Sequence, residues 1–243
     1  MKVVLTETQI CYLVLNKQDN NYAVLNENVN FNSLKRKIKH LLLIGVTLAG
    51  ITMAITKLPV SEVEKEELTH FAKQELLAKQ KTEQEQMRLD SISNVKINAC
   101  QAYMEKALKN QGYNNDSTDL SPQALVKASE KYSFDLPLLM AAAHLESCFG
   151  ATPRAKRTNS VYSVGAYDNG RDMITYSHPD QSIDGYINLL NNDYLTDGKT
   201  IDDLLKPGGF INKNGHRYAS KKNYEALLKS VRNKIIAQYP ELA

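Results

Sequence analysis

The sequence has little cysteine, little net charge and no internal repeat. Its three cysteines, Cys11, Cys100 and Cys148, are far apart and have no histidine neighbours, which excludes the usual ligand spacing of a zinc site. Thirty basic side chains against twenty-seven acidic ones give a net charge of +3, far below the basic excess typical of nucleic-acid binding. We therefore expect no metal, no cofactor and no nucleic-acid partner.

The residues that are present suffice for one ordinary domain with extensions. Of the 243 residues, 42% are hydrophobic and 23% are charged. A chain of this size can bury one core and still carry further segments. Its mildly basic balance is compatible with an anionic polymer such as a cell wall, although this signal is weak.

One apolar run indicates a membrane anchor. Residues 41–55 carry no charge, and the run stays largely apolar to Val60, so it approaches the roughly 20 residues that cross a bilayer. Basic residues precede it and an acidic-rich stretch follows, which predicts the N-terminus inside and the C-terminal domain outside, periplasmic or extracellular. We expect a single-pass membrane protein that contacts the membrane through residues 41–57. A cleaved signal and a buried hydrophobic helix are the alternatives.

These features divide the chain into four parts. Residues 1–34 form a short N-terminal, cytoplasmic segment, and residues 35–60 form the transmembrane anchor. Residues 61–98 are rich in Glu, Lys, Gln and Ala and contain no Gly or Pro, which predicts a helical stalk. The remaining residues, 99–243, form the domain that we expect to carry the function.

Within this domain the pattern is mainly α with one short β element. A hydroxyl cap followed by proline at Ser121-Pro122 starts one helix, and Asp135 starts a second, strongly apolar one. The Asn-Gly pair at 169–170 lies between two apolar stretches and predicts a β-hairpin. Further helices are expected over 100–110, 182–190, 202–205 and 222–239.

Glu146 lies near the C-terminal end of the most apolar predicted helix and is the first candidate for catalysis. Holding a glutamate against an apolar core disfavours its charged form and raises its pKa. A raised pKa is what a general acid for a glycosidic oxygen requires near neutral pH. From the pattern alone, Glu146 is either such an acid or a buried, paired structural carboxylate.

A resemblance to a known family favours the catalytic reading. Residues 121–150, ending in AAAHLESCFG, resemble the opening of bacterial and phage glucosaminidases of glycoside hydrolase family 73, in the lysozyme and lytic transglycosylase superfamily. Residues 151–170, 173–190 and 217–235 resemble later segments of that family in the same order. The resemblance implies a lysozyme-like α+β domain with a short hairpin, whose partner and substrate is the glycan strand of peptidoglycan.

The resemblance also implies roles for individual residues. Glu146 would be the general acid, and Tyr218 would lie near the substrate. Tyr224 is the second tyrosine of the same signature and would contact substrate or belong to the core. Tyr162 and Tyr167 would stack on sugar faces, or simply pack in the hairpin.

The second catalytic group is left open. Asp168 is a candidate for the second carboxylate that many family members carry, or an ordinary turn residue before Asn-Gly. Without such a carboxylate, catalysis would need the 2-acetamido group of the substrate or an intramolecular attack, as in lytic transglycosylases. Cys100 and Cys148 would form a disulfide in an exported domain, or remain two free thiols. The alternatives in function are a lytic transglycosylase, a phage lysis enzyme and a non-catalytic glycan-binding or structural virion or envelope protein.

Overall fold

The computed structural model describes residues 31–43, 45–58, 60–165 and 174–243, which divide into two compact units, 1–89 and 90–243. Among the described residues of the first unit are α2 (Phe31–Leu43), α3 (Leu48–Thr56) and the first part of α4 (Glu62–Asn110). Residues 1–30 of the expected N-terminal segment lie outside the described residues.

The apolar run at 41–55 does not form a single helix. Its chain turns at Gly45, which has a φ of +88°, and α3 then begins with Thr47 as its cap, whose side chain accepts from the Gly50 N–H at 3.3 Å. Much of the run is buried in a small apolar core that includes Leu68 and Ala72 of α4. No helix within the described ranges is both long and apolar enough to cross a membrane. The predicted anchor, and with it the single-pass topology, is wrong because a capped turn divides the run into two short pieces.

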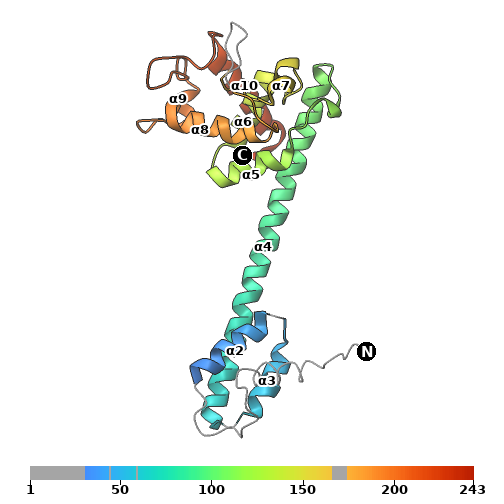
Figure 1. Ribbon diagram of the computed structural model, residues 1–243, viewed down its shortest axis with the longest axis vertical. Helices are drawn as coiled ribbons and strands as arrows, with labels where there is room; N and C mark the ends of the chain where they lie inside the picture. The colour runs from blue at the N-terminus through green and yellow to red at the C-terminus, as the bar shows by residue number, and fades with distance from the viewer. Residues whose placement is uncertain (1–30, 44, 59, 166–173) are drawn as a thin grey trace. The chain divides into compact units, whose positions relative to one another are not determined.

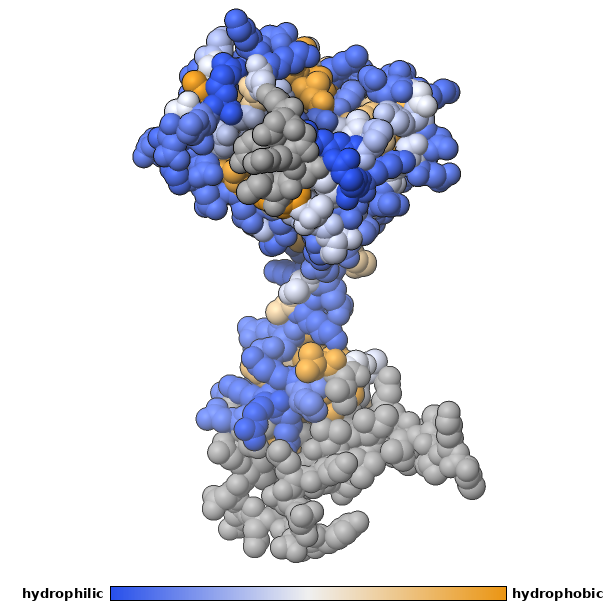
Figure 2. All heavy atoms as spheres, turned by 45° about the horizontal axis from the view of Figure 1, so that its top comes forward, coloured by the Kyte–Doolittle hydropathy of each residue, from blue (hydrophilic) through white to orange (hydrophobic). Residues whose placement is uncertain are grey.

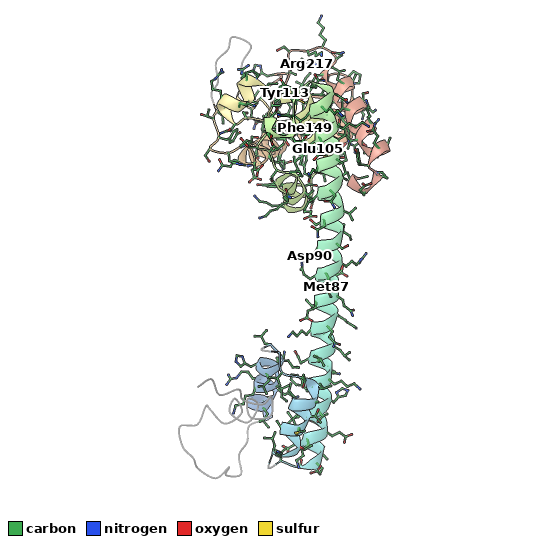
Figure 3. The ribbon with its side chains drawn as sticks, turned by 90° about the vertical axis from the view of Figure 1, so that its right-hand side faces the viewer. Met87, Asp90, Glu105, Tyr113, Phe149 and Arg217 are labelled. Carbon is green, nitrogen blue, oxygen red and sulfur yellow. The ribbon has the colours of Figure 1, made fainter. Side chains whose placement is uncertain are left out.

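α4 is a single helix of 49 residues. It covers the sequence for which a stalk was predicted and continues through the helix predicted at 100–110. Figure 3 shows Met87 and Asp90 projecting from its middle part. In the C-terminal unit its last turns contribute Tyr103 and Ala107 to the core.

The C-terminal unit is built around α6. Figure 1 shows α6 (Leu136–Ser147) in its middle, and α6 packs against α5 (Pro122–Tyr132) and α10 (Tyr224–Gln238). The remaining short elements are η1 (Asn115–Ser117), α7 (Pro153–Thr158), α8 (Gln181–Leu189), η2 (Leu190–Tyr194), α9 (Ile201–Leu204) and η3 (Pro240–Leu242). The face of this unit seen in Figure 2 is mostly hydrophilic, with small scattered apolar patches.

The sequence explains why α6 lies at the centre. Its first eight residues, 136–143, are all buried, and a helix that is apolar on every side has to be covered on every side. The Asp135 carboxylate caps its N-terminus by accepting from the Leu138 N–H at 2.7 Å. Ser121 caps α5 in the same way through the Ala124 N–H at 3.0 Å. Both helix starts agree with the sequence prediction.

The predicted fold class, which rests on a β-hairpin, has to be corrected. The described residues are mainly helical and contain no strand; their one isolated bridge joins Ile211 and Arg217. Residues 161–165, which precede the predicted hairpin turn, form a series of turns and not a strand. Ser163 (φ 54°) and Gly165 (φ 70°) adopt left-handed conformations that a strand does not allow. The predicted turn of the hairpin falls within residues 166–173 and lies outside the described residues. An α+β domain with a β-hairpin is therefore wrong for the part of the chain that the structure describes.

Candidate active site

Glu146 lies at the C-terminal end of α6 and lines a pocket. The pocket encloses about 310 Å³, counting the space at its open mouth, and α7 and residues 160–164 supply much of its wall. The side chain of Glu146 is half-buried. Its position follows from the capped helix that carries it, whose first eight residues are buried.

The surroundings of Glu146 favour its protonated form. Burial raises the pKa of the Glu146 carboxyl above its ordinary value of 4.5, because a charged form is poorly solvated there. The neighbouring hydroxyls of Tyr224 and Ser163 act in the opposite direction and lower the pKa, but burial is the larger effect. A half-buried carboxyl with a raised pKa beside an open pocket can donate a proton to a bound molecule.

A cluster of aromatic rings packs beside Glu146. Tyr162 stacks on Tyr186 with ring centroids 4.4 Å apart, and Tyr218 meets Tyr186 edge to face at 5.8 Å. Tyr224 is tilted against Tyr218 at 5.7 Å. The negative charge of Glu146 contributes to raising the pKa of Tyr186, Tyr218 and Tyr224, although burial is the largest cause for each. These three tyrosines therefore form the near surroundings of the carboxyl.

Several buried hydroxyls around the site have no hydrogen-bond partner. Within the described ranges these are Ser160, Tyr162, Tyr186 and Tyr224, and Ser160 lines the pocket. Tyr224 approaches the Glu146 carboxyl closely enough to affect its pKa, but not in hydrogen-bonding geometry. An unpaired buried hydroxyl costs about 1–3 kcal/mol. Of these four, Ser160 lines the pocket and can offer its hydroxyl to a bound molecule.

The structure separates the candidate tyrosines by environment. Tyr162 is completely buried in the core, so its ring packs on protein rather than on a ligand. Tyr224 is also a core residue, with its ring 5% exposed. Tyr218 is half-buried, and its hydroxyl donates to the backbone carbonyl of Tyr162. Tyr167 and Asp168 lie outside the described residues.

The chain leaves α6 through an unusual turn. Cys148, Phe149 and Gly150 have φ values of 49°, 60° and 90°, so three successive residues are left-handed. The Phe149 N–H donates to the carbonyl of Ala143 at 2.9 Å and thereby closes the end of the helix. The Phe149 ring is fully buried and lies inside the unit (Figure 3). The turn directs the following residues along the pocket.

Neither a disulfide nor a nucleophile pair is formed near Glu146. Cys100 and Cys148 are free thiols, and Cys100 contacts the Met140 sulfur at 3.4 Å. His144 Nδ1 lies 2.8 Å from the Tyr103 hydroxyl, whereas the Ser147 hydroxyl donates to a backbone carbonyl. Within the described ranges no three His, Cys, Asp or Glu side chains are grouped as metal ligands.

Sequence reasoning missed several residues of the site. Ser160, Ser163 and Arg154 line the pocket, and Tyr186 neighbours the carboxyl. The spacing of Ile183, Tyr186 and Ile187 signals a buried helix face, but nothing in it distinguishes a tyrosine beside Glu146 from ordinary core. The serines carried no signal because they act only through the turns that bring them to α6. Arg154 is placed by α7, which the sequence analysis did not predict.

Comparison with known proteins adds nothing to this geometry. No protein-family model, curated protein or solved structure matches the chain.

Proposed function

We propose that this protein is a glycoside hydrolase that cleaves the glycan strands of peptidoglycan, with Glu146 as its general acid. The observation that carries the proposal is the half-buried Glu146 carboxyl, with its raised pKa, at the wall of an open pocket. The ordered resemblance of residues 121–235 to glucosaminidases supplies the substrate class.

The lining of the pocket is consistent with a saccharide. Hydroxyl groups of Thr152, Ser160 and Ser163 line it together with Arg154, while Ala155, Val164 and Ile174 form its apolar part. Hydroxyls and a guanidinium bond to sugar hydroxyls and amides, and small apolar side chains accommodate a methyl group. An N-acetylhexosamine carries both kinds of group.

In this proposal Glu146 donates its proton to the oxygen that links two sugar rings. The glycosidic bond to the anomeric carbon breaks as the proton is transferred, and the leaving sugar departs as a neutral alcohol. Glu146 is the one carboxylate among the described residues that line the pocket. The group that then meets the anomeric carbon is water activated by a second carboxylate such as Asp168, the 2-acetamido group of the substrate, or its 6-hydroxyl as in lytic transglycosylases.

A zymogram with embedded peptidoglycan tests the proposal. We expect clearing by the parent protein and none by Glu146→Gln, which keeps the size of the side chain and removes its proton-donating ability. Glu130→Gln is the matched control, because Glu130 is exposed on α5. Equal clearing by the parent and Glu146→Gln, or clearing by neither, would refute the catalytic role.

Mass spectrometry of the products identifies the reaction. A reducing N-acetylglucosamine end indicates a glucosaminidase, a reducing muramic acid end a muramidase, and an anhydro end a transglycosylase. Retention of the protein on insoluble peptidoglycan without any product would instead favour the glycan-binding alternative.

A further inference from the structure

A second cavity lies beside the candidate active site. It encloses about 470 Å³, again counting its open mouth, and Ala155 of α7 lines both cavities. Gly150, at the end of the turn after α6, lines the second cavity as well. The two cavities therefore both border α7, and the same short stretch of backbone contributes to the lining of each.

Charges of both signs surround this second cavity. Asp116 and Asp119 contribute carboxylates, and Lys156 contributes an ammonium group. Within the part of the chain that the structure describes, none of these three side chains makes a hydrogen bond or an ion pair. All three residues are exposed, so their hydrogen-bonding capacity is available to solvent and to a ligand.

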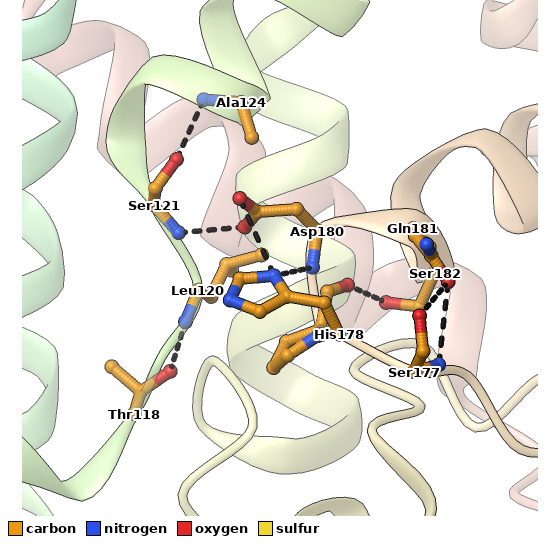
Figure 4. A network of polar contacts seen from close by, with 10 residues as sticks. Thr118, Leu120, Ser121, Ala124, Ser177, His178, Asp180, Gln181 and Ser182 are labelled. Atoms are coloured by element: carbon orange, nitrogen blue, oxygen red, sulfur yellow. Dashed lines mark hydrogen bonds and ion pairs between the residues drawn. The ribbon is translucent and has the colours of Figure 1, made fainter.

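The backbone that carries the carboxylates is held firmly. The Thr118 hydroxyl donates to the carbonyl of Phe149 and accepts from the Leu120 N–H at 3.0 Å. The Ser121 N–H donates to the Asp180 carboxylate at 2.8 Å, as Figure 4 shows. These bonds fix the 116–121 segment to the turn after Glu146 and to the start of α8. A ligand held here is consequently placed at a fixed position relative to Glu146.

The chemistry of the lining selects among ligands. Among the residues that the structure describes, no aromatic ring lines the cavity, so they offer no flat apolar surface on which sugar rings stack. Two carboxylates and an ammonium group in the same lining instead complement a molecule that carries both an amino group and a carboxylate. A divalent cation fits less well, because Lys156 adds a positive charge to the same lining.

We propose that the second cavity binds the peptide stem of peptidoglycan, with a free amino group of the stem held by Asp116 and Asp119 and a stem carboxylate held by Lys156. This inference rests on the proposed function, because the stem is attached to the strand that Glu146 cleaves. An extended peptide spans about 3.3–3.6 Å per residue, and a helix with its side chains is about 10–12 Å across. A stem of four residues is therefore long enough to pass from one cavity across α7 to the other.

The first test compares two substrates. The parent protein is given whole peptidoglycan and peptidoglycan whose stems have been removed by an amidase, and the initial rates are measured. We expect a roughly tenfold preference for the stem-bearing strands, the change that loss of one charge-assisted hydrogen bond gives. The double variant Asp116→Asn/Asp119→Asn should reduce this preference without an equal loss on the stripped strands, because Lys156 still holds the stem carboxylate.

A matched control separates the cavity from general charge effects. Glu130→Gln/Glu241→Gln removes the same number of negative charges from exposed positions outside both cavities, and it should keep the tenfold preference. Equal rates on both substrates for the parent, or an equal loss on both substrates for the Asp116→Asn/Asp119→Asn variant, would overturn the inference.

A binding measurement decides the inference independently of catalysis. A soluble stem tetrapeptide with a free side-chain amino group is titrated into the parent and into Lys156→Gln by calorimetry. We expect saturable binding to the parent and about tenfold weaker binding to Lys156→Gln. If the parent cleaves neither substrate, the proposed function fails. An absence of peptide binding, or equal binding by both proteins, would refute the stem site by itself.

Discussion

The Ser147 hydroxyl donates a hydrogen bond to the backbone carbonyl of Val161 at 2.6 Å. It also accepts from the Gly150 N–H at 2.8 Å, so the residue next to Glu146 ties the end of α6 to the segment that forms the opposite wall of the pocket. The Val161 N–H is held from the other side by Ser182 at 3.2 Å. The distance between the acid and the wall of its pocket thus depends on one buried serine.

Ser147→Ala should lower both stability and activity. The change leaves a buried carbonyl and a buried N–H without this partner, which costs about 1–3 kcal/mol in the free energy of unfolding. We expect kcat to fall more than KM changes, because the bond positions Glu146 rather than substrate. Ser129→Ala is the control, since Ser129 makes a similar 2.6 Å bond to Phe134 away from the pocket. A comparable fall in kcat for both variants would show that lost stability alone explains the effect.

Glu146→Gln should change how stability depends on pH. Because burial raises the pKa of Glu146 in the folded state, the folded protein binds this proton more tightly than the unfolded chain. The resulting stabilisation is complete below the ordinary pKa of 4.5 and is lost as the pH rises through the raised value. Relative to the parent, the variant should therefore gain stability between pH 4.5 and neutral pH. Urea unfolding at a series of pH values measures this, and a difference that does not vary with pH would contradict it.

Tyr224→Phe should shift the pH profile of cleavage. The Tyr224 hydroxyl lowers the pKa of Glu146, so its removal raises that pKa further. A general acid works only while protonated, and the alkaline limb of the rate profile should move to higher pH. Stability should not fall, because the lost hydroxyl has no hydrogen-bond partner among the described residues. Tyr162→Phe also loses an unpaired hydroxyl and should leave the alkaline limb of the rate profile unchanged. A shift of this limb in both variants would contradict the specific effect of Tyr224 on the pKa of Glu146.

Asp135 should matter for stability more than its position at a helix end suggests. It caps α6 and also pairs with Arg232 of α10, whose Nε lies 3.0 Å away. Asp135→Ala should cost about 2 kcal/mol, and Asp135→Asn about 1 kcal/mol less, because asparagine still caps the helix. The exposed pair of Lys131 and Asp184 provides the comparison, and Asp184→Asn should cost under about 0.5 kcal/mol. Urea unfolding measures all three, and equal values for the two Asp135 variants would contradict the capping role.

The sequence predicts the helices well where local signals determine them. Ser121 and Asp135 indicate the starts of α5 and α6, and apolar spacing indicates α8 and α10. These elements can be predicted because helix capping and burial of one helix face depend on residues that are close in the sequence. Position 146 could likewise be found, since it lies near the C-terminal end of the most apolar helix. Helix α7 was missed because it has only six residues and no apolar period.

The sequence predictions fail where tertiary contacts determine the local conformation of the chain. The run at 41–55 has the composition of a membrane span, but Thr47 and Gly45 turn it back onto α4. Its length of 15 residues lies between that of a core helix and that of a span, and composition alone does not choose between them. The prediction of the hairpin failed because Ser163 has a left-handed backbone conformation, which the residue type serine does not indicate. The pocket serines depend on that same backbone and could not be predicted.

The left-handed turn after α6 also constrains how the chain can vary. Asparagine and glycine accept such backbone angles with little strain, whereas valine and isoleucine do not. Cys148 therefore stands where the backbone disfavours β-branched residues, and its side chain packs in a small buried cluster with Leu108 and Ala151. Substitution libraries should be depleted of β-branched residues at this position even though these match cysteine in hydrophobicity.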